Sequence, residues 1–328
     1  MSQQMQAIII SKFGGPDVLI SETVPKPVPS RGEVLIKVKA FGLNHAEMHM
    51  RKGEWDEWNP ITGLECVGVV EECPGGDIPV GTKVAGIMGG MGRSRPGSYG
   101  EYVTTPITNV VALETNLPWE ELAAIPEVYT TAWSCLFTVL DLKAGERILI
   151  RGATSTIGQA AVHLAVDLGA KVTATTRRQD RFEWLKSLGV VDAVREQQNL
   201  QTQFVEEARF DKVLSLIGNS VLVESIRLAT TGGRVLQAGW LGGLAPVKDF
   251  NPMVEMESGV HFSLFHSKVV GTPDFPLSAV PLQEIVGKIE NGAWSAKPVA
   301  VFDVGDIQAA HALLDSHDSK GKIIIKRV

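Results

Sequence analysis

The sequence predicts an α/β protein in which a doubly wound parallel sheet, a Rossmann domain, accompanies a second, mostly β, barrel-like domain. Residues 147–169 have the pattern of a buried strand, a turn of mainly small residues and a helix, and strands then alternate with helices to about residue 266. Before residue 122, short alternating runs are separated by Gly and Pro clusters instead. The length of 328 residues also exceeds what one core usually spans.

The composition is that of an ordinary globular chain with no general attraction to nucleic acid or membranes. Hydrophobic residues make up 44%, the net charge is −6, and no apolar run approaches the roughly 20 residues of a membrane span. The N-terminal residues lack the basic region of a secretory signal. Three scattered cysteines form neither a disulfide framework nor a metal clip. We therefore expect a cytoplasmic protein with no nucleic-acid and no membrane partner.

The first domain is expected in residues 1–122. Alternating and β-rich runs predict five strands there, and the proline-rich segment 25–30 is unsuited to a central strand. The predicted strands are Met5–Ser11, Val34–Ala40, Cys66–Glu72, Lys83–Ile87 and Tyr99–Pro106. In the glycine-rich loop of residues 86–98, Arg93 and Arg95 either border a substrate or are solvated charges.

The second domain, residues 123–266, is organised around the 147–169 segment. Arg147–Arg151 carries three aliphatic residues in a row, as expected of a strand buried on both faces. A helix that opens after a tight turn presents free backbone N–H groups, which attract phosphate. The glycine pattern of the turn is degraded, with Thr154 and Ser155 where glycines are often found. A tight turn without a ligand is therefore the alternative.

Five more strands and three helices complete the predicted Rossmann domain. The strands are Lys171–Thr176, Val190–Val194, Asp211–Ile217, Arg234–Ala238 and His261–Phe265, and the helices are 179–189, 200–208 and 220–230, with ThrGlyGly (231–233) as a turn. Such a sheet has its ligand crevice at the carboxyl ends of the strands. Residues 267–328 are expected to return to the first domain, with helices Leu282–Glu290 and Asp306–Ser316 and a final strand Lys322–Lys326.

Arginines follow the second Rossmann strand, where NAD-binding folds usually place an acidic residue for the ribose hydroxyls. Arg177, Arg178 and Arg181 come directly after that strand, and the first carboxylate is Asp180. Guanidinium groups suit a ribose 2′-phosphate because they form paired, charge-assisted hydrogen bonds. The alternative is a solvated helix start that happens to be basic. We favour NADPH over NADH as the cofactor.

Six segments spread along the chain are similar to one known family. They are Phe41–Glu47, Arg51–Gly53, Gly63–Val69, Ala123–Trp133, the 152–158 turn and Ser319–Ile325. With these segments the chain resembles the zinc-independent quinone oxidoreductases of the medium-chain dehydrogenase/reductase superfamily, the relatives of zeta-crystallin. The resemblance covers essentially the whole chain. It implies a GroES-like barrel, split in sequence, beside a Rossmann domain, and a homodimer.

The resemblance also implies that zinc is not used. Zinc alcohol dehydrogenases of the superfamily place a cysteine near Asn44 and a Gly-His-Glu where this chain has leucine in the middle of Gly63–Glu65. The four-cysteine structural lobe is absent as well. His45 and His49 can share a helix face, and Glu65 remains, but the pattern lacks a suitable third ligand. We expect no metal site.

Without a metal to polarise an alcohol, the favoured reaction is hydride addition to an already electron-poor carbon, in a quinone or an α,β-unsaturated carbonyl compound. The resemblance places Asn44 beside the nicotinamide or substrate, and Tyr129 is a candidate hydrogen-bond or proton donor. The alternatives are an Asn44 that caps a turn and a Tyr129 that packs in the core. His45, His49 and His261 are expected to be structural.

Further residues are candidates for contact with NADPH, mostly by resemblance. Ser155, Thr156 and Ile157 would present backbone N–H groups to the pyrophosphate, and Gly158 would allow close approach. Lys322 is a weaker candidate, with a surface strand lysine as the alternative. The complete set is Thr130, Ser155, Thr156, Ile157, Gly158, Arg177, Arg178, Arg181, Gly218, Gly239, Trp240, Leu241, Phe262, Ser263 and Lys322.

The sequence therefore favours an NADPH-dependent reductase of small-molecule quinones or activated alkenes. Trp55 stands near the position where related enoyl thioester reductases carry an acid tyrosine, which argues against a thioester reductase. Two alternatives stay open. One is a zinc-dependent alcohol dehydrogenase, and the other is an NADPH-binding protein with a structural or regulatory role.

Overall fold

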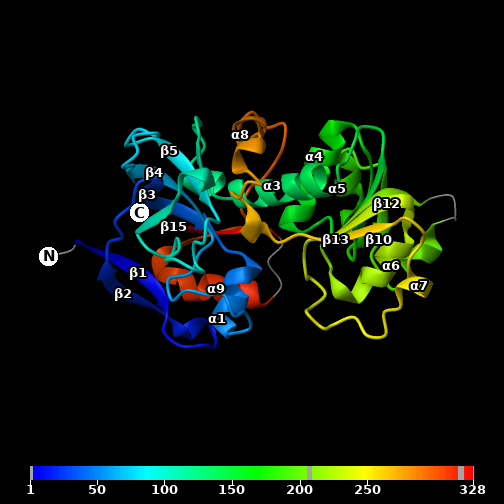
Figure 1. Ribbon diagram of the computed structural model, residues 1–328, viewed down its shortest axis with the longest axis horizontal. Coiled ribbons are helices and arrows are strands. Elements are labelled where there is room, and N and C mark those ends of the chain that lie inside the picture. The colour runs from blue at the N-terminus through cyan, green and yellow to red at the C-terminus, as the bar shows by residue number, and fades with distance from the viewer. Residues whose placement is uncertain (1–2, 205–208, 317–320, 328) are drawn as a thin grey trace. The chain divides into compact units, whose positions relative to one another are not determined.

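The computed structural model describes residues 3–204, 209–316 and 321–327. The chain forms two compact units (Figure 1). The first unit comprises the residues up to 130 together with those from 267 onward, and the second comprises residues 131–266.

Within the described part of the second unit, six parallel strands form one sheet. They are β8 (Arg147–Arg151), β9 (Lys171–Thr176), β10 (Asp192–Arg195), β11 (Phe210–Ser215), β12 (Ala229–Gln237) and β13 (His261–Leu264). Their order across the sheet is β10-β9-β8-β11-β12-β13. The chain runs outward from β8 to β10 and then crosses back to β11, so the winding reverses between β8 and β11. The predicted doubly wound parallel sheet is confirmed.

The helices of this unit are α4 (Thr156–Leu168), α5 (Phe182–Ser187), α6 (Leu222–Arg227) and α7 (Pro252–Glu255). Ile148, Leu149 and Ile150 of β8 are fully buried, as their aliphatic run predicts. The α4 helix ends at Gly169, whose φ of +85° is the left-handed conformation that glycine adopts without a steric penalty.

Several predicted boundaries in this unit were wrong. The predicted helix at 179–189 begins as a 3₁₀ turn and becomes α helical only from Phe182, and β10 begins two residues after the predicted Val190. The predicted ThrGlyGly turn lies inside β12, where Gly232 has a φ of +75° and the register against β11 shifts. Of the predicted helix at 200–208, Leu200–Gln203 forms a 3₁₀ turn, and residues 205–208 lie outside the described residues.

The first unit is mostly β. Its strands are β1 (Gln4–Ile10), β2 (Leu19–Pro25), β3 (Glu33–Gly42), β4 (Glu65–Glu72), β5 (Lys83–Ile87), β6 (Tyr102–Pro106), β7 (Val110–Ala112), β14 (Ala300–Asp303) and β15 (Ile323–Lys326). β1 and β2 form a hairpin. The ten-residue β3 organises the larger sheet because it pairs with β4 and also with both β6 and β15. In Figure 1 the red β15 accordingly runs beside the blue β3.

The helices of the first unit are α1 (His45–Lys52), α2 (Trp119–Leu122), α3 (Pro126–Trp133, which continues past residue 130), α8 (Leu282–Glu290) and α9 (Ile307–Asp315). The bounds of α8 are those that the sequence predicted. The prediction missed β2, β7 and β14, which are short or largely exposed strands without a strong apolar alternation. Among the described residues, the helices all fall short of the length and apolarity that a membrane crossing requires.

A buried polar network joins α9 to α1. The Arg51 side chain is fully buried, and its guanidinium donates to both carboxylate oxygens of Asp315 at 2.6 and 2.7 Å and to the carbonyl oxygen of Gly14 at 2.6 Å. Its Nε donates to Nδ1 of His311, so Nε2 of that ring carries the proton and donates to the Tyr99 hydroxyl at 2.7 Å. Burial, with the nearby Arg51 charge, lowers the pKa of His311 to about 3. The Arg51–Gly53 motif therefore has a structural role.

Replacing Arg51 with Gln is expected to lower the free energy of unfolding by about 3 kcal/mol, because it leaves part of a buried ion-pair network without its cation. Lys52 provides a matched control, since it also pairs with Asp315, at 3.3 Å, but is partly exposed. Lys52→Gln should cost less than about 1 kcal/mol. Urea denaturation of both variants measures the difference, and equal costs would contradict the assignment.

Candidate active site

The turn between β8 and α4 is built to leave backbone N–H groups at the start of a helix. Gly152 has a φ of +82°, in the left-handed region. Ser155 caps α4: its hydroxyl accepts from the N–H of Gly158 at 3.2 Å and donates to the carbonyl oxygen of Gly152 at 2.8 Å. The Ser155 N–H also donates to that carbonyl, at 3.0 Å. The N–H groups open to an anion are therefore those of Thr156 and Ile157 in the first turn of the helix, and not that of Ser155 as predicted.

Gly158 is required by close packing within the turn between β8 and α4. A Cβ atom there would lie 2.5 Å from the carbonyl oxygen of Gly152 and 2.7 Å from the Cα of Ala153. Glycine therefore lets the first turn of α4 pack directly on the turn that precedes it. The role of Gly158 in the close approach of a pyrophosphate stays a prediction.

The loops after β11 and β12 meet at the same carboxyl edge. Gly218 has a φ of +100°, and a Cβ there would lie 2.8 Å from the carbonyl oxygen of Gly239. A Cβ at Gly239 would lie 2.6 Å from the carbonyl oxygen of Leu216. The Leu241 N–H donates to that same oxygen at 3.1 Å. Both predicted glycines are thus required by close backbone packing of two crevice loops.

The other predicted cofactor residues of this unit lie along the β12–β13 side. Trp240 stacks on His266 with ring centroids 5.0 Å apart. Leu241 and Phe262 are exposed, and the Ser263 hydroxyl donates to the carbonyl oxygen of Val235 at 3.4 Å. The second unit therefore brings together, at one edge of its sheet, the turn residues, the crevice glycines and Trp240.

The arginines after β9 are mostly exposed, and one of them is already paired. Arg178 forms a bidentate ion pair with Asp180, in which its Nε donates to Oδ1 at 3.1 Å. The hydrogen bond from Arg178 lowers the pKa of Asp180. The Arg181 guanidinium lies over the Trp184 ring, 5.3 Å from its centroid. Among the described residues Arg177 makes no ion pair, so it presents an open cation beside the end of β9.

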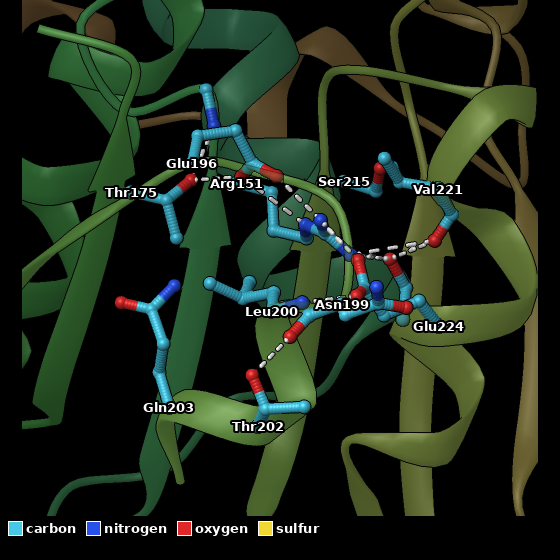
Figure 2. Close-up of polar contacts among 12 residues, drawn as sticks. Arg151, Thr175, Glu196, Asn199, Leu200, Thr202, Gln203, Ser215, Val221 and Glu224 are labelled. Carbon is cyan, nitrogen blue, oxygen red and sulfur yellow. Dashed lines mark hydrogen bonds and ion pairs between the residues drawn. The ribbon is translucent and has the colours of Figure 1, made fainter.

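A buried network beneath the turn escaped sequence reasoning. The last residue of β8, Arg151, is fully buried, and Figure 2 shows its guanidinium between the carboxylates of Glu196 and Glu224, at 2.5 and 2.7 Å. The Thr175 hydroxyl donates to Glu196 and accepts from the N–H of Gly152, so the network reaches the turn itself. An arginine at the end of an aliphatic strand was the available signal, but the sequence does not say which carboxylates meet it.

In the first unit, the ammonium group of Lys322 is held by a cage of oxygens. It lies 2.6 Å from Oδ1 of Asn44, 2.6 Å from Oε1 of Glu65 and 3.5 Å from Oε2 of Glu127. The lysine side chain is 5% exposed and the Glu65 side chain 2%. The alternative of a surface strand lysine is therefore wrong. Lys322 lies with Asn44 in the first unit.

The amide of Asn44 is fully engaged in this cluster. Its oxygen accepts from Lys322, and its nitrogen donates to Glu47 and Glu65, at 3.3 Å in both cases. Asn44 is also the N-cap of α1, and its backbone N–H donates to Oε2 of Glu47 at 2.9 Å. Asn44 therefore has the capping position that the sequence left open as an alternative role. Its side-chain amide is also oriented by Lys322, Glu47 and Glu65.

Burial controls the protonation of the cluster. It raises the pKa of Glu47 from 4.5 to about 7, although the charge of Lys322 opposes the shift. Burial also raises the pKa of Glu65. For Lys322, burial disfavours the charged form, but Glu65 and Glu127 outweigh it and the pKa lies above its ordinary value. Lys322 therefore stays positively charged, because the neighbouring carboxylates stabilise its charge.

Tyr129 and Thr130 are both buried on α3. The Tyr129 ring stacks on Trp294 with centroids 5.8 Å apart and planes 6° apart, and burial raises its pKa above the ordinary value. Tyr129 can therefore donate a hydrogen bond at any physiological pH but yields its proton reluctantly. The Thr130 hydroxyl is buried and has no hydrogen-bond partner among the described residues.

The histidines considered as metal ligands do not converge. Nδ1 of His49 pairs with Glu54 at 2.5 Å. His45, the other histidine weighed as a ligand, is exposed, and so is His261, which was expected to be structural. Across the described ranges, no group of three or more His, Cys, Asp or Glu side chains has the geometry to hold a metal ion.

Comparison with known proteins agrees with the two-unit architecture. A family model described as "Alcohol dehydrogenase GroES-like domain" matches residues 30–115, and one described as "Zinc-binding dehydrogenase" matches residues 156–280. Curated quinone oxidoreductases are similar along the whole chain. That of Lama guanicoe is 27% identical over 98% of this chain and 97% of its own, and that of Homo sapiens is 26% identical with the same coverage.

Solved structures show the same fold. Mycobacterial Rv1454c complexed with NADPH superposes with a TM-score of 0.83 at 22% identity, covering 98% of this chain and 99% of its own. The chain belongs to the medium-chain dehydrogenase/reductase superfamily, with a GroES-like domain and a Rossmann domain. Within that superfamily it belongs to the quinone oxidoreductase group, and it is an oxidoreductase.

Replacing Glu47 with Gln is expected to change how stability depends on pH. The folded chain holds a proton on Glu47 up to a pKa of about 7, whereas the unfolded chain loses it near 4.5. This contribution to stability is complete below the unfolded pKa and is lost as pH rises to the folded pKa. In that window the unfolding free energy of the natural chain should fall with pH more steeply than that of the variant, by up to about 1.4 kcal/mol per pH unit. Urea denaturation across the window measures both slopes, and parallel curves would refute the assignment.

Proposed function

We propose that this protein transfers hydride from NADPH to a quinone or an α,β-unsaturated carbonyl compound without zinc. The observation that carries the proposal is the position of the Lys322 ammonium among oxygens of Asn44, Glu65 and Glu127. In the zinc alcohol dehydrogenases of the superfamily, metal ligands stand near Asn44 and at Leu64. Here an amide and a leucine replace them, and a lysine supplies the positive charge.

Zinc does not fit this donor set. Zinc sites in proteins are built from thiolate, imidazole and carboxylate ligands in a tetrahedral arrangement. The side chains around Lys322 provide only oxygens, and their shared contact is with an ammonium group of raised pKa. The protonated ammonium group of Lys322 already occupies this position, so a zinc ion has no space among the same oxygens. These facts support a reaction in which no metal polarises the substrate.

We propose residues 123–266 as the NADPH-binding domain, that is, the second unit together with the eight residues before it. The N–H groups of Thr156 and Ile157 would hold the pyrophosphate at the start of α4. Arg177 and Arg178 would hold the 2′-phosphate, with Asp180 released from its pair. The buried hydroxyl of Thr130, which lacks a partner among the described residues, is a candidate contact for the cofactor's amide.

The remaining predicted cofactor contacts stay part of this proposal. Gly218, Gly239, Trp240 and Leu241 would line the crevice at the carboxyl ends of β11 and β12, with Phe262 and Ser263 on β13 beside them. Lys322 is reassigned, because its buried contacts are with the Asn44 cluster.

When bound, NADPH supplies the hydride, and the residues of the first unit would hold the acceptor. Lys322 fixes the oxygen of the Asn44 amide at 2.6 Å, which leaves its nitrogen facing two carboxylates at the longer distance of 3.3 Å. Long hydrogen bonds are weak, so one amide hydrogen can turn to the oxygen of a substrate as negative charge develops there. Tyr129 is a second candidate donor. Its raised pKa keeps it protonated, so it would stabilise the oxygen by a hydrogen bond rather than by proton transfer.

The same contacts favour a second candidate function, that of an NADPH-binding protein with a structural or regulatory role. Both candidate catalytic residues make contacts that a non-catalytic protein would also need: Asn44 caps α1, and Tyr129 packs on Trp294. Tight NADPH binding without turnover of any acceptor would select this function.

We further propose a cytoplasmic homodimer. β13 is the last strand of its sheet, and its outer edge has no partner strand within the described residues. Phe262 and Leu264 on that strand are 40% and 51% exposed, and such an apolar edge favours pairing with a second copy. The three cysteines, all within the described ranges, form no disulfide, in keeping with a reducing compartment.

Arg178→Gln is expected to weaken NADPH binding about tenfold and to leave NADH binding unchanged, because only the 2′-phosphate needs that cation. Asp180→Asn should shift the preference in the opposite direction by freeing the guanidinium. Arg227, an exposed arginine of α6 paired with Glu255, is the control. Fluorescence titration with both nucleotides measures the affinities, and equal losses for NADPH and NADH would rule out the assignment.

The proposed reaction predicts that NADPH is consumed in a saturable way with quinones or enones. A metal chelator should not lower the rate of this consumption. Lys322→Met should lower kcat at least about tenfold with little change in the Kd for NADPH, because the substitution removes the group that orients Asn44. Steady-state kinetics, nucleotide titration and metal analysis test these points together. Stoichiometric zinc in the purified protein, or activity lost to a chelator, would overturn the metal-free mechanism.

A further inference from the structure

Outside the Lys322 cluster, Trp55 packs against two cationic or ionisable groups. The His49 ring stacks on its indole with centroids 5.3 Å apart and planes 13° apart. The guanidinium carbon of Arg93 lies 5.2 Å from the same indole centroid. His49 belongs to α1, the helix that Asn44 caps, and Arg93 belongs to the glycine-rich loop after β5. One member of this stack, His49, therefore lies on the helix that Asn44 caps.

Arg93 is the member of this stack with hydrogen-bonding capacity to spare. Its side chain is 14% exposed, and its Nε is buried without a hydrogen-bond partner among the described residues. Its Nη1 is 3.6 Å from Oε2 of Glu57, which is beyond hydrogen-bonding distance. The other oxygen of Glu57 accepts from Lys268 at 2.9 Å. The Glu57 carboxylate thus contacts both Lys268 and Arg93, and its contact with Arg93 is the longer and weaker of the two.

Arg95, two residues further along the loop, shows the contrast. Its Nη1 donates to Oε1 of Glu33 at 2.7 Å, a direct ion pair with one carboxylate. Of the two arginines for which the sequence left a substrate contact and a solvated charge open, Arg95 is paired, whereas Arg93 keeps a buried donor without an acceptor. A buried N–H without a partner is unfavourable, and a ligand oxygen that accepts from it removes that penalty.

Backbone packing places Arg93 near the proposed substrate groups: a Cβ atom on its neighbour Gly92 would lie 2.8 Å from the nitrogen of Gly63. The next N–H along the chain, that of Leu64, donates to Oε1 of Glu47 at 3.2 Å. Burial lowers the pKa of Arg93, while the charges of Glu57 and Glu47 oppose that shift. Glu47 is the carboxylate that Asn44 contacts directly. Arg93 therefore lies within electrostatic reach of the cluster that would hold the reacting carbonyl group.

We propose that Arg93, supported by Trp55, forms a subsite for a carboxylate carried by the conjugated carbonyl substrate. The proposal rests on the proposed reductase function and names the substrate class within it. A guanidinium offers Nε–H and Nη–H as a planar fork that matches the two oxygens of a carboxylate. The indole supports that fork through its cation–π contact with the guanidinium. Neutral acceptors of the same shape lack the oxygens to satisfy the fork.

The test compares benzoylacrylate, an enone with a carboxylate, with its neutral methyl ester. The ester is the more electron-poor acceptor, so a preference for the acid must come from the protein. In the natural chain kcat/KM for the acid relative to the ester should be at least about tenfold higher than in Arg93→Gln, since a charge-assisted bidentate contact is lost. Arg95→Gln is the matched control and should leave the ratio unchanged. An equal ratio in the natural chain and in Arg93→Gln overturns the subsite.

Two further measurements separate the subsite from folding and from the reductase function. Trp55→Phe weakens the support of Arg93 without removing the cation and should lower the acid-to-ester ratio about threefold, which keeps the proposal testable if Arg93→Gln does not fold. Calorimetric titration with benzoylacrylate measures binding without turnover. Binding that Arg93→Gln abolishes supports the subsite even if neither compound is reduced, in which case the reductase function fails alone. Binding that survives in Arg93→Gln refutes the subsite.

Discussion

The first unit depends on the burial of one ammonium group among carboxylates that lie far apart in the sequence. Lys322 precedes β15, Asn44 precedes α1, Glu65 opens β4 and Glu127 lies on α3. Removing any of these charges from water costs several kcal/mol, so each is tolerable only because the others are present. The contact therefore fixes the positions of four elements at once. It also sets the orientation of the one amide that the proposed reaction uses.

The second unit applies the same rule in a different place. Arg151 is buried at the end of β8 and is paired with Glu196, which directly follows β10, and with Glu224 of helix α6. Through Thr175 the network contacts Gly152, so the turn that would hold phosphate rests on an ion-pair cluster and not on apolar packing alone. Both units thus combine an apolar core with a buried cation near the proposed chemistry. Water cannot compete at either point, which keeps the geometry fixed.

Local pattern was sufficient to predict the parts of the fold that local forces decide. The aliphatic run of β8, the C-cap of α4 at Gly169 and the bounds of α8 follow from periodicity and backbone preference. The 3₁₀ start of the helix after β9 and the continuation of β12 through Gly232 depend on tertiary packing, so propensity failed there. The candidate site shows the same division. The phosphate-type turn was predicted, but the partner of Lys322 could not be, because a lysine beside a strand does not reveal which distant carboxylates will surround it.

The pairing of β3 with β15 has a consequence for the order in which the chain can fold during synthesis. The residues of the Rossmann unit are contiguous, so all of its strands have been made once the ribosome has passed residue 266. The edge of β3 at residues 40–42, in contrast, waits for residues 324–326. A nascent chain therefore exposes that edge until residues 324–326 have been made, and closing so long a loop is slow. The N-terminal half of the barrel is the part of the newborn protein that most needs protection from premature association.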